Sequence, residues 1–115
     1  MNRVILSGRI GNEIELRKTT SGKFVTNIML AVNRDKDSVD WINVALWENK
    51  AEFVSNYAKK GSMLLIDGHL NVNKYTDKEG RNAVSYTVVA DRVEMPRQPG
   101  GNANVPYESE EEFPF

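Results

Sequence analysis

Alternation of hydrophobic and polar residues dominates this chain and predicts β-strands. In the first stretch Val4, Leu6 and Ile10 alternate with polar residues, interrupted by Ile5, which is typical of a strand with one buried face. Later stretches show the same alternation or are rich in β-branched residues, and polar loops separate them. The predicted strands cover residues 3–10 with a continuation over 13–19, then 23–33, 41–47, 62–75 and 83–95.

One segment, residues 49–61, follows a helical pattern instead. Its apolar residues recur at the spacing of one helix face, namely Ala51, Val54, Tyr57 and Ala58. Asn49 is a suitable N-cap and Gly61 a suitable end, so a short helix is predicted between the third and fourth strands. Five strands with a helix at this place have the element order of the OB-fold, a partly open Greek-key barrel. The predicted class is therefore all-β.

The third predicted strand, WINVALW, carries both tryptophans of the chain on one side. Successive strand residues point to opposite faces, so the aliphatic residues form the core face, while Trp41 and Trp47 lie on a mixed face with Asn43. In the fourth strand the predicted core face holds Leu64, Ile66, Leu70 and Val72, and the polar face holds Asp67, His69, Asn71, Asn73 and Tyr75. Tyr75 is thus placed on a polar face, as the tryptophans are.

Aromatic side chains on a polar sheet face, interleaved with cations, are typical of sequence-independent binding to single-stranded nucleic acid. Bases stack on the rings, and cations follow the phosphates. Trp41, Trp47 and Tyr75 are the candidate stacking residues. The candidate phosphate contacts are Arg3, Arg9, Lys59, Lys60, Lys74, Lys78 and Arg81. Two simpler interpretations stay open: the tryptophans could be buried in a subunit interface, and the lysines could be solvated surface residues.

Composition narrows the classes of function. The chain has 115 residues, which favours one domain, with no cysteine and one histidine. It also lacks closely paired carboxylates of the kind that general acid and base catalysis uses. We therefore expect a protein that is not an enzyme and has no cofactor or metal. No apolar run approaches the roughly 20 residues that cross a bilayer, and MNRVILSGRIG is too short for a signal peptide, so a cytoplasmic location is expected.

Charge is distributed unevenly along the chain, whose formal net charge is -1. Residues 107–115 (YESEEEFPF) contain four Glu and no Lys or Arg, so residues 1–106 have 15 basic against 12 acidic residues, a charge of +3. Residues 96–106 are rich in Pro, Gly and Asn and predict a flexible linker. The expected organisation is a domain over residues 1–95, this linker, and a disordered acidic tail over residues 107–115.

The chain resembles the bacterial-type single-stranded DNA-binding protein family over essentially all of residues 1–95. The similar segments are MNRVILSGRIG, SGKFVTNIMLAVNR, DWINVALW, NKAEFVSNYAKKGS, IDGHL, KYTDKEG and VVADRVEM. The end, EEEFPF, resembles the acidic tail of that family. The resemblance implies an OB-fold that assembles as a homotetramer and wraps single-stranded DNA without sequence preference. It also places Trp41, Trp47 and Tyr75 where the family has base-stacking aromatics.

The resemblance further implies a role for the tail. The docking site for replication, recombination and repair proteins would be Glu110, Glu111, Glu112, Phe113, Pro114 and Phe115, and the protein would associate with the nucleoid through single-stranded DNA. The sequence departs from the family in two places. The loop RDKDSVD is short and has no aromatic residue, so one stacking residue is missing, and the linker is brief. A module for single-stranded RNA, and an OB module that binds proteins, remain alternatives.

Overall fold

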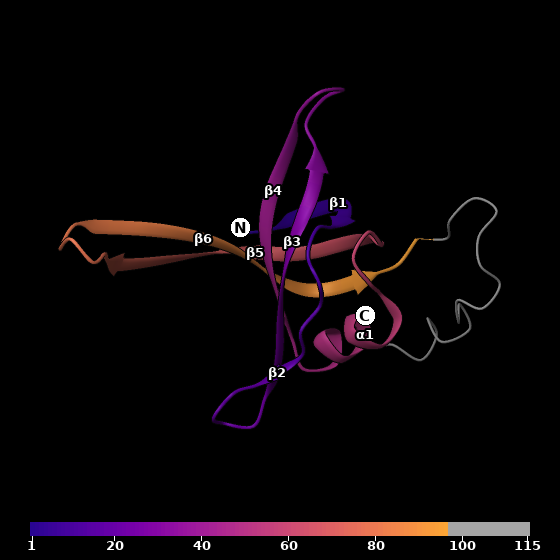
Figure 1. Cartoon of the computed structure of the whole chain (residues 1–115), viewed down its shortest axis with the longest axis horizontal. Helices are drawn as coiled ribbons and strands as arrows, with labels where there is room; N and C mark the ends of the chain where they lie inside the picture. The colour runs from indigo at the N-terminus through magenta and orange to yellow at the C-terminus, as the bar shows by residue number, and fades with distance from the viewer. Residues whose placement is uncertain (97–115) are drawn as a thin grey trace.

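The computed structural model describes residues 1–96 (Figure 1). Its elements are β1 (Val4–Ile10), β2 (Arg17–Lys18), β3 (Phe24–Asn33), β4 (Val39–Trp47), α1 (Asn49–Tyr57), β5 (Met63–Thr76) and β6 (Asn82–Glu94). The predicted linker after Pro96 and the predicted docking residues Glu110 to Phe115 lie outside the described residues, so the predicted domain limits stay predictions. The all-β class with one helix between the third and fourth long strands is confirmed.

The strands form one sheet that closes on itself. Their order is β1-β5-β6-β4-β3-β2, and β1 pairs with β3 as well as with β5. The closing contact is short, since it joins Arg9 to Ala31 and Ile10 to Leu30. The β4–β6 contact is the parallel one and is equally short, whereas the other pairs are antiparallel. This arrangement confirms the predicted OB-fold barrel.

The core lies inside the barrel, and α1 covers part of it. Buried aliphatic residues come from each long strand, as the alternation predicted: Ile10, Ile28, Leu30, Val44, Leu46, Leu64, Ile66 and Val93. From the helix, Ala51, Phe53 and Val54 are buried in the same cluster. Burying an aliphatic side chain contributes about 1.5–3 kcal/mol, so this cluster is the main source of stability in a chain without disulfides.

The helix begins and ends differently from the prediction. Asn49 is the first helical residue, and Glu48 occupies the N-cap position without a side-chain cap. Glu48 is held there by Phe24, because the backbone N–H of Phe24 donates to Glu48 Oε1 at 2.9 Å and the N–H of Glu48 donates to the carbonyl of Phe24 at 2.8 Å. The helix ends at Tyr57, and Gly61, with φ 94°, lies in the turn that follows.

The predicted continuation of the first strand is largely wrong. Within residues 13–19, strand pairing is confined to Arg17 and Lys18, which pair with β3. The physical reason is Asn12, whose side-chain Oδ1 accepts from the backbone N–H of Met29 at 2.8 Å. That amide takes the place of a strand residue beside β3, so the chain leaves the ladder before it returns at Arg17.

The β5–β6 hairpin extends beyond the barrel, to the left in Figure 1. Leu70 and Val72, which were predicted to lie in the core, are exposed on this extension. That prediction is wrong because the alternation continues along the hairpin after the opposing wall of the barrel has ended. A bulge at Asp91, between the Asp67–Arg92 and Gly68–Ala90 pairs, marks the place where the hairpin changes direction.

Candidate nucleic-acid interface

The candidate stacking residues share one continuous sheet face. Strands β5, β6, β4 and β3 are neighbours in that order, and directly paired residues point to the same side. Asn71 pairs with Thr87, Asn43 pairs with Met29, and Asn43 Nδ2 donates to Thr87 Oγ1 at 3.2 Å, which joins the two pairs across β4 and β6. We call this surface the outer sheet face, defined as the odd-numbered residues of segments 25–31, 41–47, 69–75 and 83–89.

Two of the three candidate rings on the outer sheet face are open to solvent. The exposed fraction is 57% for Trp41 and 52% for Tyr75, while Trp47 is partly buried. The ring of Trp41 lies directly on Gly11, where a Cβ atom would collide with Trp41 Cζ3. Trp47 lies six positions after Trp41 along β4, a distance of about 20 Å, so each ring can take a different nucleotide of one strand.

Three candidate cations gather at one hollow near the edge of the outer sheet face. Arg9, Lys59 and Lys60 line a hollow of about 620 Å³ together with Tyr57 at the end of α1 and residues of the α1–β5 turn. Arg9 Nη1 donates to the carbonyl of Gly61 at 3.0 Å, which fixes the guanidinium at its rim. Arg9 pairs with Ala31, and Ala31 pairs with Trp41, so this hollow lies two strands away from the Trp41 ring.

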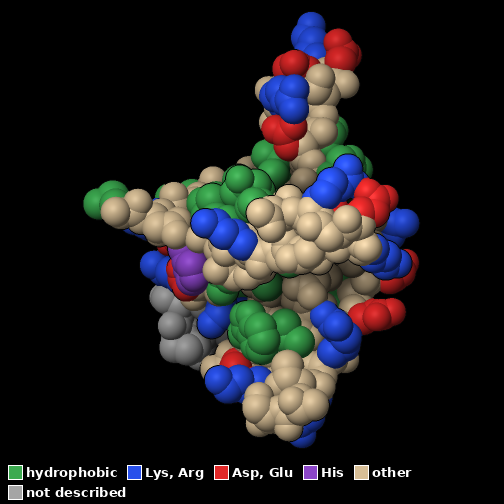
Figure 2. All heavy atoms as spheres, turned by 90° about the vertical axis from the view of Figure 1, so that its left-hand side faces the viewer, with side chains coloured by type: hydrophobic (Ala, Val, Ile, Leu, Met, Phe, Trp, Pro, Cys, Tyr) green, Lys and Arg blue, Asp and Glu red, His purple; other side chains and the backbone are tan. Residues whose placement is uncertain are grey.

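Three further candidate cations, Lys74, Lys78 and Arg81, lie around the tip of the β5–β6 hairpin. Lys74 points to the side opposite Tyr75, since adjacent strand residues alternate. Lys78 and Arg81 lie in or beside the turn, where Arg81 forms ion pairs with Glu79 and, at 3.4 Å, with Asp77. Figure 2 looks onto this tip and shows hydrophobic side chains above and below it, with Lys and Arg side chains beside them.

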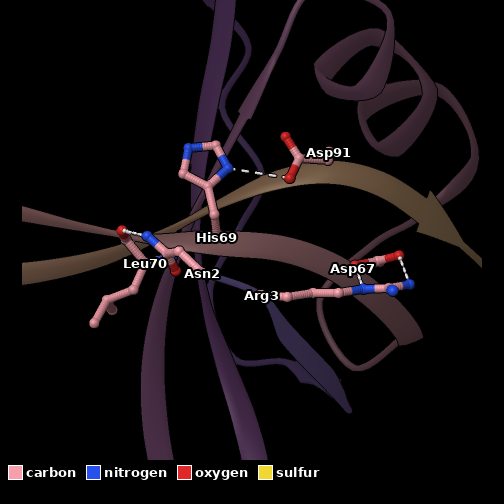
Figure 3. Close-up of polar contacts among 6 residues, drawn as sticks. All are labelled: Asn2, Arg3, Asp67, His69, Leu70 and Asp91. Carbon is pink, nitrogen blue, oxygen red and sulfur yellow. Dashed lines mark hydrogen bonds and ion pairs between the residues drawn. The ribbon is translucent and has the colours of Figure 1, made fainter.

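Arg3 lies apart from the other candidates and already has a partner. Its Nε and Nη2 donate to the two carboxylate oxygens of Asp67 at 3.1 and 2.9 Å (Figure 3). The hydrogen bonds from Arg3 lower the pKa of the Asp67 carboxyl group below its ordinary value. Asn2 reinforces the contact, because its side-chain amide exchanges two hydrogen bonds of 2.8 Å with the backbone of Leu70. Arg3 therefore fixes the N-terminus on β5.

Tyr86 is an exposed aromatic residue that the sequence analysis missed. Its exposed fraction is 61%, and it lies opposite Val72 on the face of the hairpin that does not carry Tyr75. Leu70 and Val84 are exposed on the same side. The alternation in AVSYTVVA puts Tyr86 on the same side as Val84 and Val88, which by pattern alone is typical of a core face. The exposure of Tyr86 follows from the length of the hairpin, which no local pattern gives.

The described residues offer neither a metal site nor a membrane span. Among residues 1–96, no cluster of three or more His, Asp or Glu side chains could hold a metal ion. His69 contacts Asp91, at 3.0 Å between Nδ1 and Oδ2 (Figure 3). No helix in this part of the chain is long and apolar enough to cross a bilayer.

Comparison with known proteins agrees with this geometry. The chain is 40% identical over 115 residues to the single-stranded DNA-binding protein of Halalkalibacterium halodurans, covering 91% of this chain and 68% of that protein. It is 41% identical over 101 residues to single-stranded DNA-binding protein 2 of Staphylococcus aureus (83% and 73% covered). It is 36% identical over 115 residues to single-stranded DNA-binding protein A of Bacillus subtilis (93% and 67% covered).

The matched part of the chain thus covers 67% to 73% of the length of these three relatives, about two thirds. Residues 1–96, which include the whole barrel and the outer sheet face, match the model of the Single-strand binding protein family. Members of this family are DNA-binding proteins and not enzymes, in agreement with the expectation from composition. On the strength of the barrel topology and these matches, the chain belongs to the single-strand binding protein family.

Proposed function

We propose that this protein binds single-stranded DNA by stacking bases on Trp41, Trp47 and Tyr75. The observation that carries the proposal is the exposure of Trp41 and Tyr75, 57% and 52%, on the sheet face that also holds Trp47. Exposed rings on one sheet face are accessible to unpaired bases, and a base stacked on an aromatic ring contributes about 1–3 kcal/mol. The hollow with Arg9, Lys59 and Lys60 lies beside this face and supplies charge for phosphates.

A fluorescence titration tests this function. Both tryptophans of the chain belong to the proposed site, so oligo-dT should quench the intrinsic emission strongly. Double-stranded DNA of the same length should quench it weakly, because paired bases cannot reach the rings. Emission that ignores oligo-dT would overturn the proposal and favour an OB module that binds proteins.

DNA and RNA must be distinguished separately, because stacking does not depend on the sugar. Single-stranded DNA is the ligand that the names of the relatives state. Competition between oligo-dT and oligo-U for the protein decides the point. DNA that displaces RNA at lower concentration supports the proposal, and the reverse order would replace it with single-stranded RNA binding.

Self-association into a homotetramer is part of the proposal. Between Val4 and Gly8, β1 pairs with β5, while its pairing with β3 within residues 1–96 is confined to Arg9 and Ile10. The other edge of β1 is therefore available to a second copy, and Ile5 beside it is 66% exposed. The hairpin face with Tyr86 provides a second apolar surface. A molar mass measured in solution should correspond to a tetramer, and a monomeric mass would refute this part.

The acidic end is proposed as a docking segment for replication, recombination and repair proteins. Phe113 and Phe115 are apolar side chains next to Glu110, Glu111 and Glu112, a combination that suits a basic pocket with an apolar floor. A flexible coil of eleven residues spans about 17–20 Å, so the linker predicted over residues 96–106 would let the end act away from the barrel. Through single-stranded DNA the protein would reside with the nucleoid in the cytoplasm.

A further inference from the structure

The outer sheet face contains no Lys, Arg, Asp or Glu. Its sixteen positions, the odd-numbered residues of the four segments that define it, are Ala, Val, Met, Asn, Ser, Thr, Trp, Tyr and one His. A surface that tracks phosphates is normally lined by cations. Here the neighbouring cations lie around the face, at the hollow with Arg9 and at the hairpin turn with Arg81. The middle of the site must therefore hold a nucleic acid by other means.

Amides and hydroxyls occupy this middle. Asn71 and Asn73 are exposed, and their side-chain amides have no hydrogen-bond partner among residues 1–96. Asn71 lies opposite Thr87, and Asn73 lies opposite Ser85. Asn43 donates to Thr87 Oγ1 at 3.2 Å, which leaves its own amide oxygen as an acceptor. Asn43 thus lies between the two tryptophans on β4, and Asn71 and Asn73 precede Tyr75 on β5.

We propose that Asn43, Asn71 and Asn73 form hydrogen bonds with the edges of unpaired bases that stack on the neighbouring rings. This inference rests on the proposed function and names what the middle of the same site recognises. A side-chain amide presents a donor beside an acceptor. The Watson–Crick edges of bases do the same, as with N3–H and O4 of thymine or N4–H and N3 of cytosine. An amide that turns over can pair with either order, so these contacts add affinity without selecting one sequence.

The proposal separates two contributions to affinity. Contacts with phosphates release counterions and weaken with salt, by about 0.7 in the logarithmic slope for each contact with a single strand. Neutral hydrogen bonds to base edges release none. The amides should therefore contribute a part of the affinity that is the same at low and at high salt, and that depends on base edges.

The test is a cycle of two proteins and two strands, with the full chain. The protein is changed at Asn71→Ala and Asn73→Ala together. The strand is oligo-dT or the same oligonucleotide built from N3-methylthymidine, which keeps ring, sugar and phosphate but has no N3–H donor. Asn82→Ala is the matched control, because Asn82 is an exposed asparagine of the same hairpin at an even-numbered position, on the opposite face.

The unchanged protein and the Asn82→Ala control should bind the methylated strand about threefold to tenfold more weakly than oligo-dT, as expected for one or two lost hydrogen bonds. The double variant should lose most of this discrimination and keep only the part that Asn43 contributes, with an unchanged salt slope. Equal binding of both strands by the unchanged protein, or full discrimination by the double variant, would overturn the inference while the proposed function stands. An unchanged protein that binds neither strand would overturn both.

Discussion

At the scale of single residues, the availability of the Trp41 ring depends on a glycine. Gly11 has no Cβ, and a methyl group there would collide with Trp41 Cζ3 and approach the carbonyl of Met29 at 3.2 Å. The variant Gly11→Ala should therefore displace the ring. We expect a loss of affinity for oligo-dT no larger than that of Trp41→Ala, about 1–3 kcal/mol. Fluorescence titration of both variants measures it, and unchanged affinity in Gly11→Ala would show that this position of the ring is not needed.

The two tyrosines of the hairpin should separate DNA binding from self-association. Tyr75 and Tyr86 are both exposed, but they lie on opposite faces. Tyr75→Ala should cost about 1–3 kcal/mol in affinity for single-stranded DNA, since one stacked base is lost. Tyr86→Ala should leave tryptophan quenching in place and shift the measured molar mass toward smaller assemblies. If instead Tyr86→Ala abolishes quenching while the mass stays the same, the assignment of the two faces is wrong.

At the scale of elements, the start of β1 is tied to β5 by the Arg3–Asp67 pair, and this tie should respond to pH. The folded state lowers the pKa of Asp67 through hydrogen bonds from Arg3. A lowered pKa stabilises the fold above the ordinary carboxyl pKa, and the contribution disappears as the pH falls through the lowered value. Arg3→Ala should therefore lower the unfolding temperature near neutral pH.

Thermal unfolding of both proteins over a pH series provides the measurement. The difference between them should shrink as the pH falls and vanish once Asp67 is protonated in both. Arg81→Ala is a control, since its partners lie in the hairpin turn and not between two strands. A difference that is constant over the whole pH series would mean that Arg3 acts by packing and not through the carboxylate.

The sequence predicted the elements that depend on local alternation. It failed where a contact between residues far apart in the chain determines the structure. The five long strands and the shared face of Trp41, Trp47 and Tyr75 follow from period-two patterning and the observed pairing. The helix start was wrong because Phe24, far away in the chain, holds Glu48 in the cap position. Leu70 and Val72 were wrongly placed in the core, because a pattern cannot tell where the barrel wall ends.

The sequence also could not predict which of the candidate cations have acidic partners and which lie close together. Seven cations were candidates by type and position, and their partners became visible in the fold: Arg3 is bound to Asp67, and Arg81 to Asp77 and Glu79. Arg9 and Lys60 are distant in the chain, yet they line one hollow because β1 pairs with the start of β5. Their roles in phosphate binding stay predictions.

At the scale of the whole molecule, charge should give a moderate salt dependence. Residues 1–106 carry +3 and residues 107–115 contain four Glu, so the tail opposes the attraction between the barrel and DNA. A chain ended after Pro106 should bind oligo-dT more tightly at low salt and show a steeper slope, if each further phosphate contact adds about 0.7 to it. Titrations at several salt concentrations compare the two chains. Identical salt curves would show that the tail never approaches the site.

The tail should act through its aromatic rings as well as through its charge, and variants can tell these apart. A segment that only keeps the protein soluble needs the glutamates, whereas a docking segment also needs Phe113 and Phe115. Phe115→Ala should therefore lose partner proteins from a bacterial lysate while oligo-dT still quenches both tryptophans fully. Glu108→Gln is the matched control, because it removes a tail charge outside the EEEFPF segment and should retain the partners. Equal recovery of partners by Phe115→Ala and the unchanged protein would reduce the tail to a solubilising role, since a charged end that tolerates loss of its ring has no need of an apolar pocket.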